Sequence, residues 1–205
     1  MIKIIDNFFE NPLEIRKIAL NLIQEQHSCI LNDSKKFYPG VRVECPHEIT
    51  EYIDEQIKTF FDMKLKNTVS RFHITSRIHG HGLTHFDPAD YAALIYLNEN
   101  PPKDSGTTFC NLLPESHVRP EGFYETSVSE DIETIESFAK YKEFYNKEYF
   151  SVDKIVENKF NRFLFYSGKQ YHSPQYCFGN NTFNSRLILI TTWDTYSSPN
   201  MWPPE

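Results

Sequence analysis

The spacing of apolar residues changes near residue 64, and this change most constrains how the chain can fold. After it, apolar residues recur in short segments that turn residues separate, and several of these segments alternate with period two. Such segments are typical of β-strands in an antiparallel sheet. The predicted strands are VSRFHITSRI (69–78), DYAALIYLN (90–98), GTTFCN (106–111), RFLFYSG (162–168) and RLILITTW (186–193).

The first 62 residues follow a helical pattern instead. Asn11 and Pro12 are typical of a helix start, and apolar residues at helical spacing extend that helix to about residue 26. A second helix is expected after Pro46. The run IKII within residues 1–9 predicts an edge strand, and residues 31–46, which hold charges and few apolar positions, are expected to form a loop.

Helices followed by many short strands predict an α+β chain. We expect one domain over residues 1–205, with a helical part at 1–62 packed on the major sheet of a core at 69–196. A double-sheet jelly roll, cupin-like in architecture, is the predicted form of that core. The charged segment at 126–150 has a helical pattern, so residues 115–150 are predicted to be a helical insertion between strands.

Charge, hydropathy and cysteine spacing argue against several classes of binding partner. The formal charge is −7 with no basic block, which disfavours nucleic acid and anionic membranes. No run of about 18 apolar residues predicts a membrane span. The four cysteines are far apart and form no C-x-x-C pair, so reduced thiols in a cytoplasmic protein are expected. The sequence does not indicate an oligomeric state.

The segment IHGHGLTHFDP (78–88) concentrates three of the eight histidines beside an aspartate. On a strand, His85 and Asp87 would point to the same face and offer an imidazole and a carboxylate to one cation. His172, which follows the predicted strand at 162–168, is the best third ligand. Two histidines and one carboxylate form the facial triad of non-haem Fe(II) oxygenases, which leaves three coordination positions open.

An alternative set of ligands is His79, His81 and His85, as in a cupin-like three-histidine site. Gly80 and Gly82 are poor strand residues and suggest a flexible turn. If the segment is such a turn, His79 and His81 lie on an exposed loop and do not bind the metal.

Arg186 opens the last predicted strand, 14 residues after His172. A buried arginine needs an anionic partner, because an unpaired buried charge is costly. Its planar guanidinium suits a carboxylate.

The order of these motifs resembles the Fe(II)- and 2-oxoglutarate-dependent dioxygenases, with the prolyl-hydroxylase-like branch closest. The resemblance covers about residues 69–196 and rests on HFD (85–87), ALIYLN (93–98), SGTTF (105–109), RFLFYSGKQYHSP (162–174) and RLILITTW (186–193). It implies a double-stranded β-helix in which His85, Asp87 and His172 bind Fe(II). Arg186 and Tyr96 would bind 2-oxoglutarate, which is consumed with O2 to give succinate and CO2 as the substrate is hydroxylated.

One departure concerns the first core strand, which lacks the tyrosine of the family at an obvious position. Thr75 or Arg77 is expected in its place. Candidates for the substrate pocket are Arg77, His79, His81 and Tyr91.

The predicted substrate is a protein or peptide side chain or a small molecule. Two other hypotheses remain. The first is a cupin-type metal enzyme that does not use 2-oxoglutarate, and the second is a non-enzymatic jelly-roll binding module.

Overall fold

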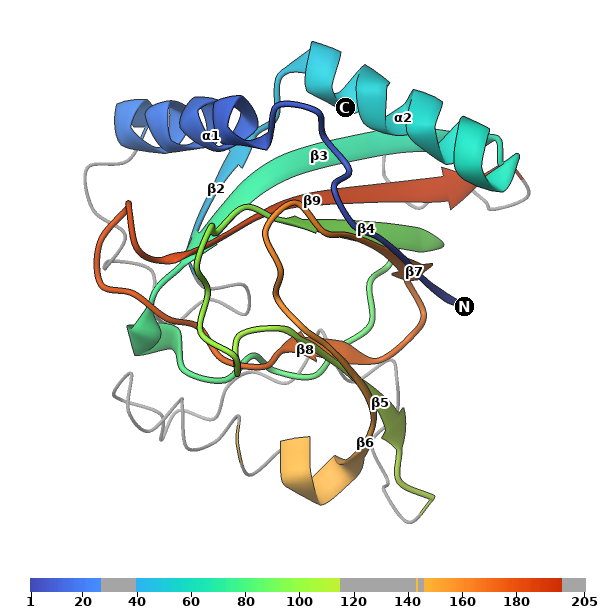
Figure 1. The fold of residues 1–205 in the computed structure, drawn as a ribbon. Coiled ribbons are helices and arrows are strands. Elements are labelled where there is room, and N and C mark those ends of the chain that lie inside the picture. Colours follow the sequence, from blue (N-terminus) through green and yellow to red (C-terminus); the bar gives the residue numbers. More distant parts are fainter. Residues whose placement is uncertain (27–39, 115–142, 144–145, 197–205) are drawn as a thin grey trace.

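In the part of the chain that the computed structural model describes, the fold consists mainly of two antiparallel sheets and two long helices (Figure 1). The structure describes residues 1–26, 40–114, 143 and 146–196. A six-stranded sheet has the order β1-β7-β4-β9-β3-β2, and a three-stranded sheet has the order β6-β5-β8. The strands are β1 (Ile2–Ile5), β2 (Val41–Glu44), β3 (Leu65–Thr75), β4 (Tyr91–Tyr96), β5 (Thr107–Leu112), β6 (Phe150–Val156), β7 (Phe163–Ser167), β8 (His172–Pro174) and β9 (Arg186–Thr195).

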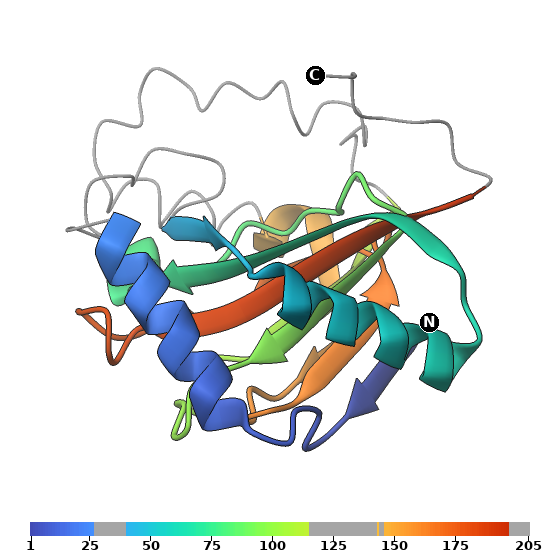
Figure 2. The ribbon, with the colours of Figure 1, turned by 90° about the horizontal axis from the view of Figure 1, so that it is seen from above.

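Helices α1 (Pro12–Gln26) and α2 (His47–Phe61) both cover one face of the large sheet (Figure 2). In α2, Ile49, Ile53 and Ile57 recur every four residues, so they form one buried stripe along the helix. This stripe joins residues such as Phe72 and Phe165 in the larger of the buried apolar clusters. Burial of this face therefore holds the N-terminal helices against the sheet, as the apolar spacing predicts.

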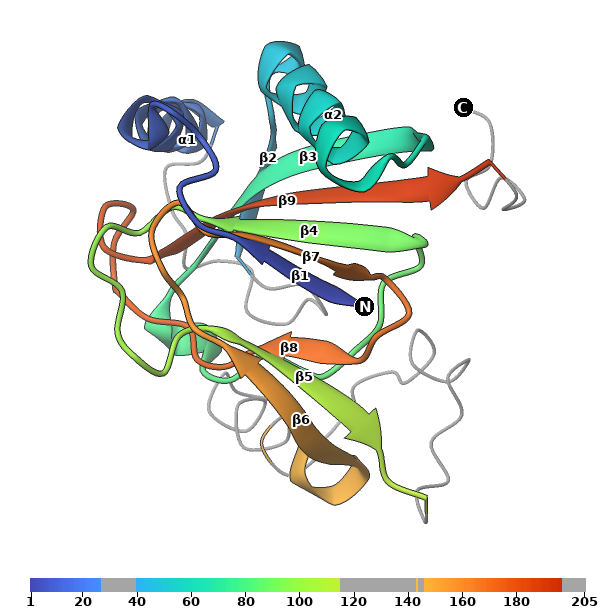
Figure 3. The same ribbon diagram turned by 45° about the vertical axis from the view of Figure 1, so that its right-hand side comes forward.

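The other face of the large sheet looks toward the small sheet (Figure 3). Side chains alternate between the two faces along each strand. In β4, Ala93 and Ile95 join the cluster beneath the helices, whereas Leu94 and Tyr96 join a second cluster with Phe109 of β5. The space between the sheets is therefore where inward-pointing residues of both sheets meet.

Three strands differ from the sequence prediction, and one of them is β8, whose residue His172 was expected only to follow a strand. Residues 41–44 form β2 rather than part of a loop, with Val41 paired to Ile74 of β3. The pattern VRVE is too short to predict a strand alone, and pairing with the long β3 stabilises it. β6 was also not predicted, and it pairs with β5.

Other boundaries differ less. β3 begins at Leu65 and ends at Thr75, and a short 3-10 helix (Arg77–His79) replaces the predicted end of the strand. Most of the predicted insertion at 115–150 lies outside the described residues, although residues 146–149 are helical. In the described part of the chain, no helix is long and apolar enough to cross a membrane.

Candidate metal centre and its cavity

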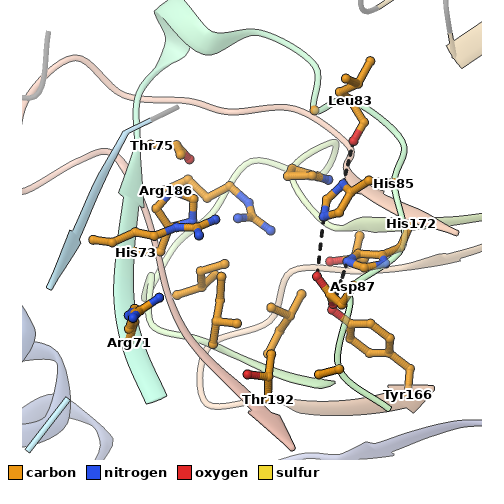
Figure 4. Close-up of a pocket in the computed structure, with 18 of the residues that line it drawn as sticks. Arg71, His73, Thr75, Leu83, His85, Asp87, Tyr166, His172, Arg186 and Thr192 are labelled. Carbon is orange, nitrogen blue, oxygen red and sulfur yellow. Dashed lines mark hydrogen bonds and ion pairs between the residues drawn. The ribbon is translucent and has the colours of Figure 1, made fainter. Parts of the chain in front are cut away.

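Three side chains with metal-binding atoms meet between the sheets: His85, Asp87 and His172. Their ligand atoms all lie within 4.8 Å of one another. Asp87 Oδ1 is 3.8 Å from His85 Nε2, and Asp87 Oδ2 is 3.5 Å from His172 Nε2 (Figure 4). Two ligand atoms at right angles, each about 2.1 Å from a metal, lie about 3 Å apart. The two distances from Asp87 to the histidines therefore need to contract by less than about 1 Å to hold one ion, and no separation within the cluster needs to contract by more than about 2 Å.

Backbone pairing brings the two histidines together. His85 and His172 form an antiparallel bridge, in which each backbone N–H donates to the other residue's carbonyl at 2.9 and 2.7 Å. The Asp87 N–H donates to the Gly168 carbonyl at 2.7 Å. Gly168 approaches this segment so closely that a Cβ there would lie 2.1 Å from the Ala89 carbonyl oxygen. A side chain at position 168 would therefore displace the segment that carries Asp87.

Hydrogen bonds orient both imidazole rings. His85 Nδ1 donates to the Leu83 carbonyl at 2.8 Å, and His172 Nδ1 donates to the Gln170 carbonyl at 2.9 Å. A carbonyl can only accept, so each Nδ1 carries the proton and each Nε2 keeps its lone pair. Both lone pairs point to Asp87, which is the orientation that carbonyl-anchored histidines present to a metal.

The electrostatics of the site favour the neutral imidazole. Burial, followed by the neighbouring His172 imidazole, lowers the pKa of His85 to about 4, and the Asp87 carboxylate opposes this change. The Arg42 guanidinium also lowers this pKa, by a smaller amount. Neutral imidazole is the form that binds metals, so His85 is ready to act as a ligand at neutral pH.

The histidine-rich segment is not a flexible exposed loop, which corrects the sequence prediction for His79. Its side chain is 3 % exposed, and its Nδ1 accepts from the Ser76 N–H at 3.0 Å. His81 is exposed, with Nδ1 2.5 Å from the Gln175 carbonyl. Gly82 packs against β8, where a Cβ would lie 2.2 Å from Pro174 Cδ. Close packing, rather than flexibility, explains this glycine.

The alternative three-histidine site is not formed. Among the described residues, one group of three possible ligands has its atoms close enough to share a metal ion. It consists of His85, Asp87 and His172. His79 and His81 line the same cavity but do not belong to this cluster.

Asn146 is a positioning residue that no motif indicated. Its amide Nδ2 donates to the Gly82 carbonyl at 2.7 Å, and its Oδ1 accepts from the Thr84 N–H at 2.8 Å. The two bonds fix the backbone immediately before His85. No local pattern could have identified Asn146, because its partners lie more than 60 residues earlier in the chain.

The triad opens into a cavity of about 530 Å³ between the two sheets. Arg186 enters this cavity from the side opposite the triad (Figure 4). Its side chain is 1 % exposed, and its Nε donates to the Ser105 carbonyl at 3.3 Å. Its Nη2 has no hydrogen-bond partner among the described residues. Thr75 is paired with Arg186 across β3 and β9. Its buried hydroxyl also has no hydrogen-bond partner among the described residues.

Tyr96 lies beside Arg186 but not on the cavity wall. The guanidinium is 5.8 Å from the centre of the Tyr96 ring, and the Tyr96 hydroxyl is hydrogen-bonded to Thr107 Oγ1 at 2.6 Å. Burial raises the pKa of Tyr96, and the charge of Arg186 opposes that change. Thr107, rather than Tyr96, is among the residues that line the cavity.

Two residues predicted for the substrate pocket are placed elsewhere. Tyr91 lies on the helix-covered face, where its ring stacks on Phe165 with centroids 5.3 Å apart. The reason is the register of β4, in which residues 92, 94 and 96 face the small sheet. Arg77 is exposed in the 3-10 helix and is not among the cavity-lining residues.

Tyr166 lines the cavity, and so do three residues that sequence reasoning missed, Arg42, Arg71 and His73. Tyr166 of β7 has its hydroxyl 3.1 Å from His172 Nε2. Arg42, Arg71 and His73 form the wall built from β2 and β3. These polar residues alternate with apolar neighbours in the sequence, which indicates that they share one face of the sheet. The alternation does not show which face adjoins a cavity.

Comparison with solved structures identifies the fold as that of 2-oxoglutarate-dependent enzymes. A prolyl-4-hydroxylase from Pseudomonas putida has a TM-score of 0.55 at 13 % identity, covering 96 % of this chain and 93 % of its own. The epimerase SnoN from nogalamycin biosynthesis, described as non-haem and α-ketoglutarate-dependent, has a TM-score of 0.57 at 11 % identity, covering 95 % and 77 %. HygX from Streptomyces hygroscopicus, solved with nickel and 2-oxoglutarate bound, has a TM-score of 0.55 at 10 % identity, covering 95 % and 83 %.

The chain itself belongs to DUF6445, a family of unknown function, which residues 1–179 match. A comparison with curated protein sequences finds no match. The likeness to prolyl hydroxylases and related enzymes that the motifs indicated is thus confirmed by structural neighbours. At identities of 10–13 % this likeness defines the fold alone.

Proposed function

We propose that this protein is an Fe(II)- and 2-oxoglutarate-dependent oxygenase that hydroxylates a small molecule or a peptide side chain and releases succinate and CO2. In this proposal the two sheets are the major and minor sheets of a double-stranded β-helix. One observation carries the proposal: a two-histidine, one-carboxylate cluster and a buried arginine without a carboxylate partner among the described residues face the same cavity. The fold of the structural neighbours supports it.

The donor set fits Fe(II). His85 and His172 would bind it through Nε2 and Asp87 through one carboxylate oxygen, which is the donor set of the facial triad in non-haem Fe(II) oxygenases. The anchored Nδ1 atoms hold both rings in place for this role. The Tyr166 hydroxyl donates to the Nε2 lone pair of His172, so it would have to turn to another acceptor if that nitrogen held a metal.

Arg186 and Thr75 are the groups that would hold the distal carboxylate of 2-oxoglutarate. A buried guanidinium with an unsatisfied N–H is costly, and a carboxylate satisfies it with a charge-assisted bond. The Thr75 hydroxyl, opposite Arg186 in the sheet, can donate to the same carboxylate. Tyr96 supports Arg186 through its ring, while its hydroxyl holds Thr107.

Apolar residues complete the cavity between these two ends. Leu94, Ile188 and Ile190 line it and limit the access of water to the metal side. When bound, Fe(II) and 2-oxoglutarate supply the oxidising chemistry that hydroxylates a C–H bond. The protein binds both reactants, fixes their orientation and provides a largely apolar site.

The test is to add Fe(II) and 2-oxoglutarate to the metal-free protein without oxygen and to record the visible charge-transfer band. We expect a band in the wild type that disappears in His172→Ala and weakens in Arg186→Ala. Arg162→Ala serves as the matched control, because Arg162 is a partly buried arginine that is paired with Asp6 and does not line the cavity. This control should keep the band.

The alternatives give different results in the same experiment. His81→Ala should keep the band if the triad binds the metal, whereas a cupin-like site would lose its metal. A bound metal without a band would remove 2-oxoglutarate from the function. Absence of metal binding would refute the enzyme and favour a binding module.

A further inference from the structure

Arg71 and Arg42 line the cavity in addition to Arg186, and nothing in the proposed function employs them. We infer that they bind a negatively charged group, a carboxylate or a phosphate, on the molecule that the enzyme hydroxylates. This inference rests on the proposed function, because it assigns the second occupant of the same cavity. It adds a substrate class, a small anionic molecule.

The strand register directs these side chains into the cavity. Arg42 of β2 is paired with His73 of β3, and paired residues lie on the same face of a sheet. Arg71 lies two residues before His73 in β3 and therefore shares that face. The alternate residues, Val43 and Phe72, are buried in the cluster beneath the helices. The two arginines and His73 therefore form one polar wall of the cavity.

This wall is distinct from the position proposed for 2-oxoglutarate. Arg186 is paired with Thr75, whereas Arg71 lies four residues earlier on β3 and is paired with Ile190. Four residues of a strand span about 13 Å. Figure 4 shows Arg71 and Arg186 as separate groups on the side of the cavity that faces the triad. One carboxylate bound between Arg186 and Thr75 therefore leaves Arg71 for another anion.

The charges that line the cavity favour an anion. Three arginines line it, and Asp87 of the triad is the one acidic residue among its described lining residues. The chain as a whole has a formal charge of −7, so this cationic wall differs from the rest of the protein. A cationic group on the substrate would be repelled by this wall, whereas an anionic group would be attracted to it.

Glu44 is the acidic residue that competes with a substrate for Arg71. It lies directly opposite Arg71 across β2 and β3. Glu44 is exposed and does not line the cavity, and the described ion pairs include none between it and Arg71. The Arg71 guanidinium therefore remains available to a ligand, and removal of Glu44 should strengthen anion binding.

Guanidinium groups bind both carboxylates and phosphates through two parallel hydrogen bonds. The cavity volume of about 530 Å³ lies within the range of small-molecule sites. Both features match a small metabolite with a terminal carboxylate or phosphate.

Calorimetric titration of the protein loaded with Fe(II) and 2-oxoglutarate under anaerobic conditions tests this inference. The probes are inorganic phosphate in one arm and acetate in the other, at constant ionic strength set with sodium chloride. The charge-transfer band, recorded in each sample, reports separately on the metal and 2-oxoglutarate. The variants are Arg71→Gln, Arg42→Gln and Glu44→Gln, with Lys3→Gln of the exposed edge strand β1 as the control for loss of one positive charge.

We expect one probe to bind while the band persists. Affinity should fall at least about 10-fold in Arg71→Gln and in Arg42→Gln, as expected for loss of a charge-assisted hydrogen bond. It should rise several-fold in Glu44→Gln and stay unchanged in Lys3→Gln. Tighter binding of phosphate would assign a phosphorylated substrate, and tighter binding of acetate would assign a carboxylate.

Other outcomes separate this inference from the proposed function. A normal band without binding of either probe would overturn the anion site and leave the oxygenase standing. Phosphate that displaces 2-oxoglutarate and binds equally well to Arg71→Gln would also overturn it, because the ion would then occupy the Arg186 position. Phosphate binding through Arg71 in a protein that shows no band would support the anion site and refute the oxygenase.

Discussion

Arg186→Met should make the metal-free protein more stable while weakening its response to 2-oxoglutarate. The Arg186 side chain is 1 % exposed, and the described ion pairs include none to it. Burial of a charge without a counterion costs several kcal/mol. The hydrogen bond to Ser105 and the contact with the Tyr96 ring recover part of that cost, each about 1.5–2 kcal/mol. Removing the charge should therefore stabilise the fold by about 2 kcal/mol.

The groups that contact Arg186 keep other hydrogen-bond partners in Arg186→Met. No newly unsatisfied polar group therefore offsets the gain in stability. The Ser105 carbonyl still accepts from Asn158 Nδ2 at 3.4 Å. The Tyr96 hydroxyl still contacts Thr107. A methionine also retains much of the apolar volume of the arginine stem. For a protein of this length, about 2 kcal/mol corresponds to a rise in Tm of roughly 4–8 °C.

The second part of this prediction concerns the ligand. With Fe(II) present and oxygen excluded, 2-oxoglutarate at 100 times its wild-type Kd should stabilise the wild type by about 2.7 kcal/mol and Arg186→Met by much less. Thermal and urea unfolding of both proteins measures the two effects. Arg162→Met is the control, because Arg162 Nε is 2.7 Å from Asp6 Oδ1 and its loss should destabilise the protein. If Arg186→Met lowers the stability of the metal-free protein as Arg162→Met does, the guanidinium is already satisfied and our reasoning fails.

Three further predictions concern the metal centre. Asp87→Ala should lower the affinity for Fe(II) by more than about 100-fold in a calorimetric titration while the protein stays folded; unchanged affinity would refute the triad. Asn146→Ala should lower the same affinity about 10-fold, because it releases the backbone before His85; an effect on stability alone would limit Asn146 to folding. The pKa of His85, about 4 in the native state, lies below the value of 6.5 in the unfolded chain, so the unfolded state takes up a proton first as the pH falls. Stability of the metal-free protein should therefore decrease between pH 6.5 and 4 by about 3 kcal/mol, and urea unfolding at these pH values should show a smaller decrease in His85→Asn.

The sequence alone was sufficient for the elements with strong local patterns. Isoleucines four residues apart predicted α2, because a helix brings such residues to one face. The cluster of candidate metal ligands could be predicted because metal chemistry restricts the residue types, and H-x-D with a distant histidine leaves few combinations. Arg186 was identifiable for a related reason, since an arginine that opens an apolar strand requires an anion.

Only the tertiary structure decided which side chains reach the cavity. The strand YAALIY is apolar at almost every position, so its alternation does not tell which face adjoins the helices and which the small sheet. Pairing with β7 and β9 places Tyr91 with the helices and Tyr96 with the small sheet. The same reason applies to Arg42 and Arg71, whose position on the cavity wall follows from the register of β2 on β3.

Long-range contacts decided the remaining features. β2 is a strand because it pairs with β3, and Asn146 matters because it reaches Gly82 and Thr84 from a distant segment. Hydrogen bonds between segments far apart in the chain leave no periodic pattern in either segment. The sequence therefore determined the elements with strong local periodicity and the candidate metal ligands, whereas the folded chain determined the short paired strands, the cavity, its charges and the residues that position the site.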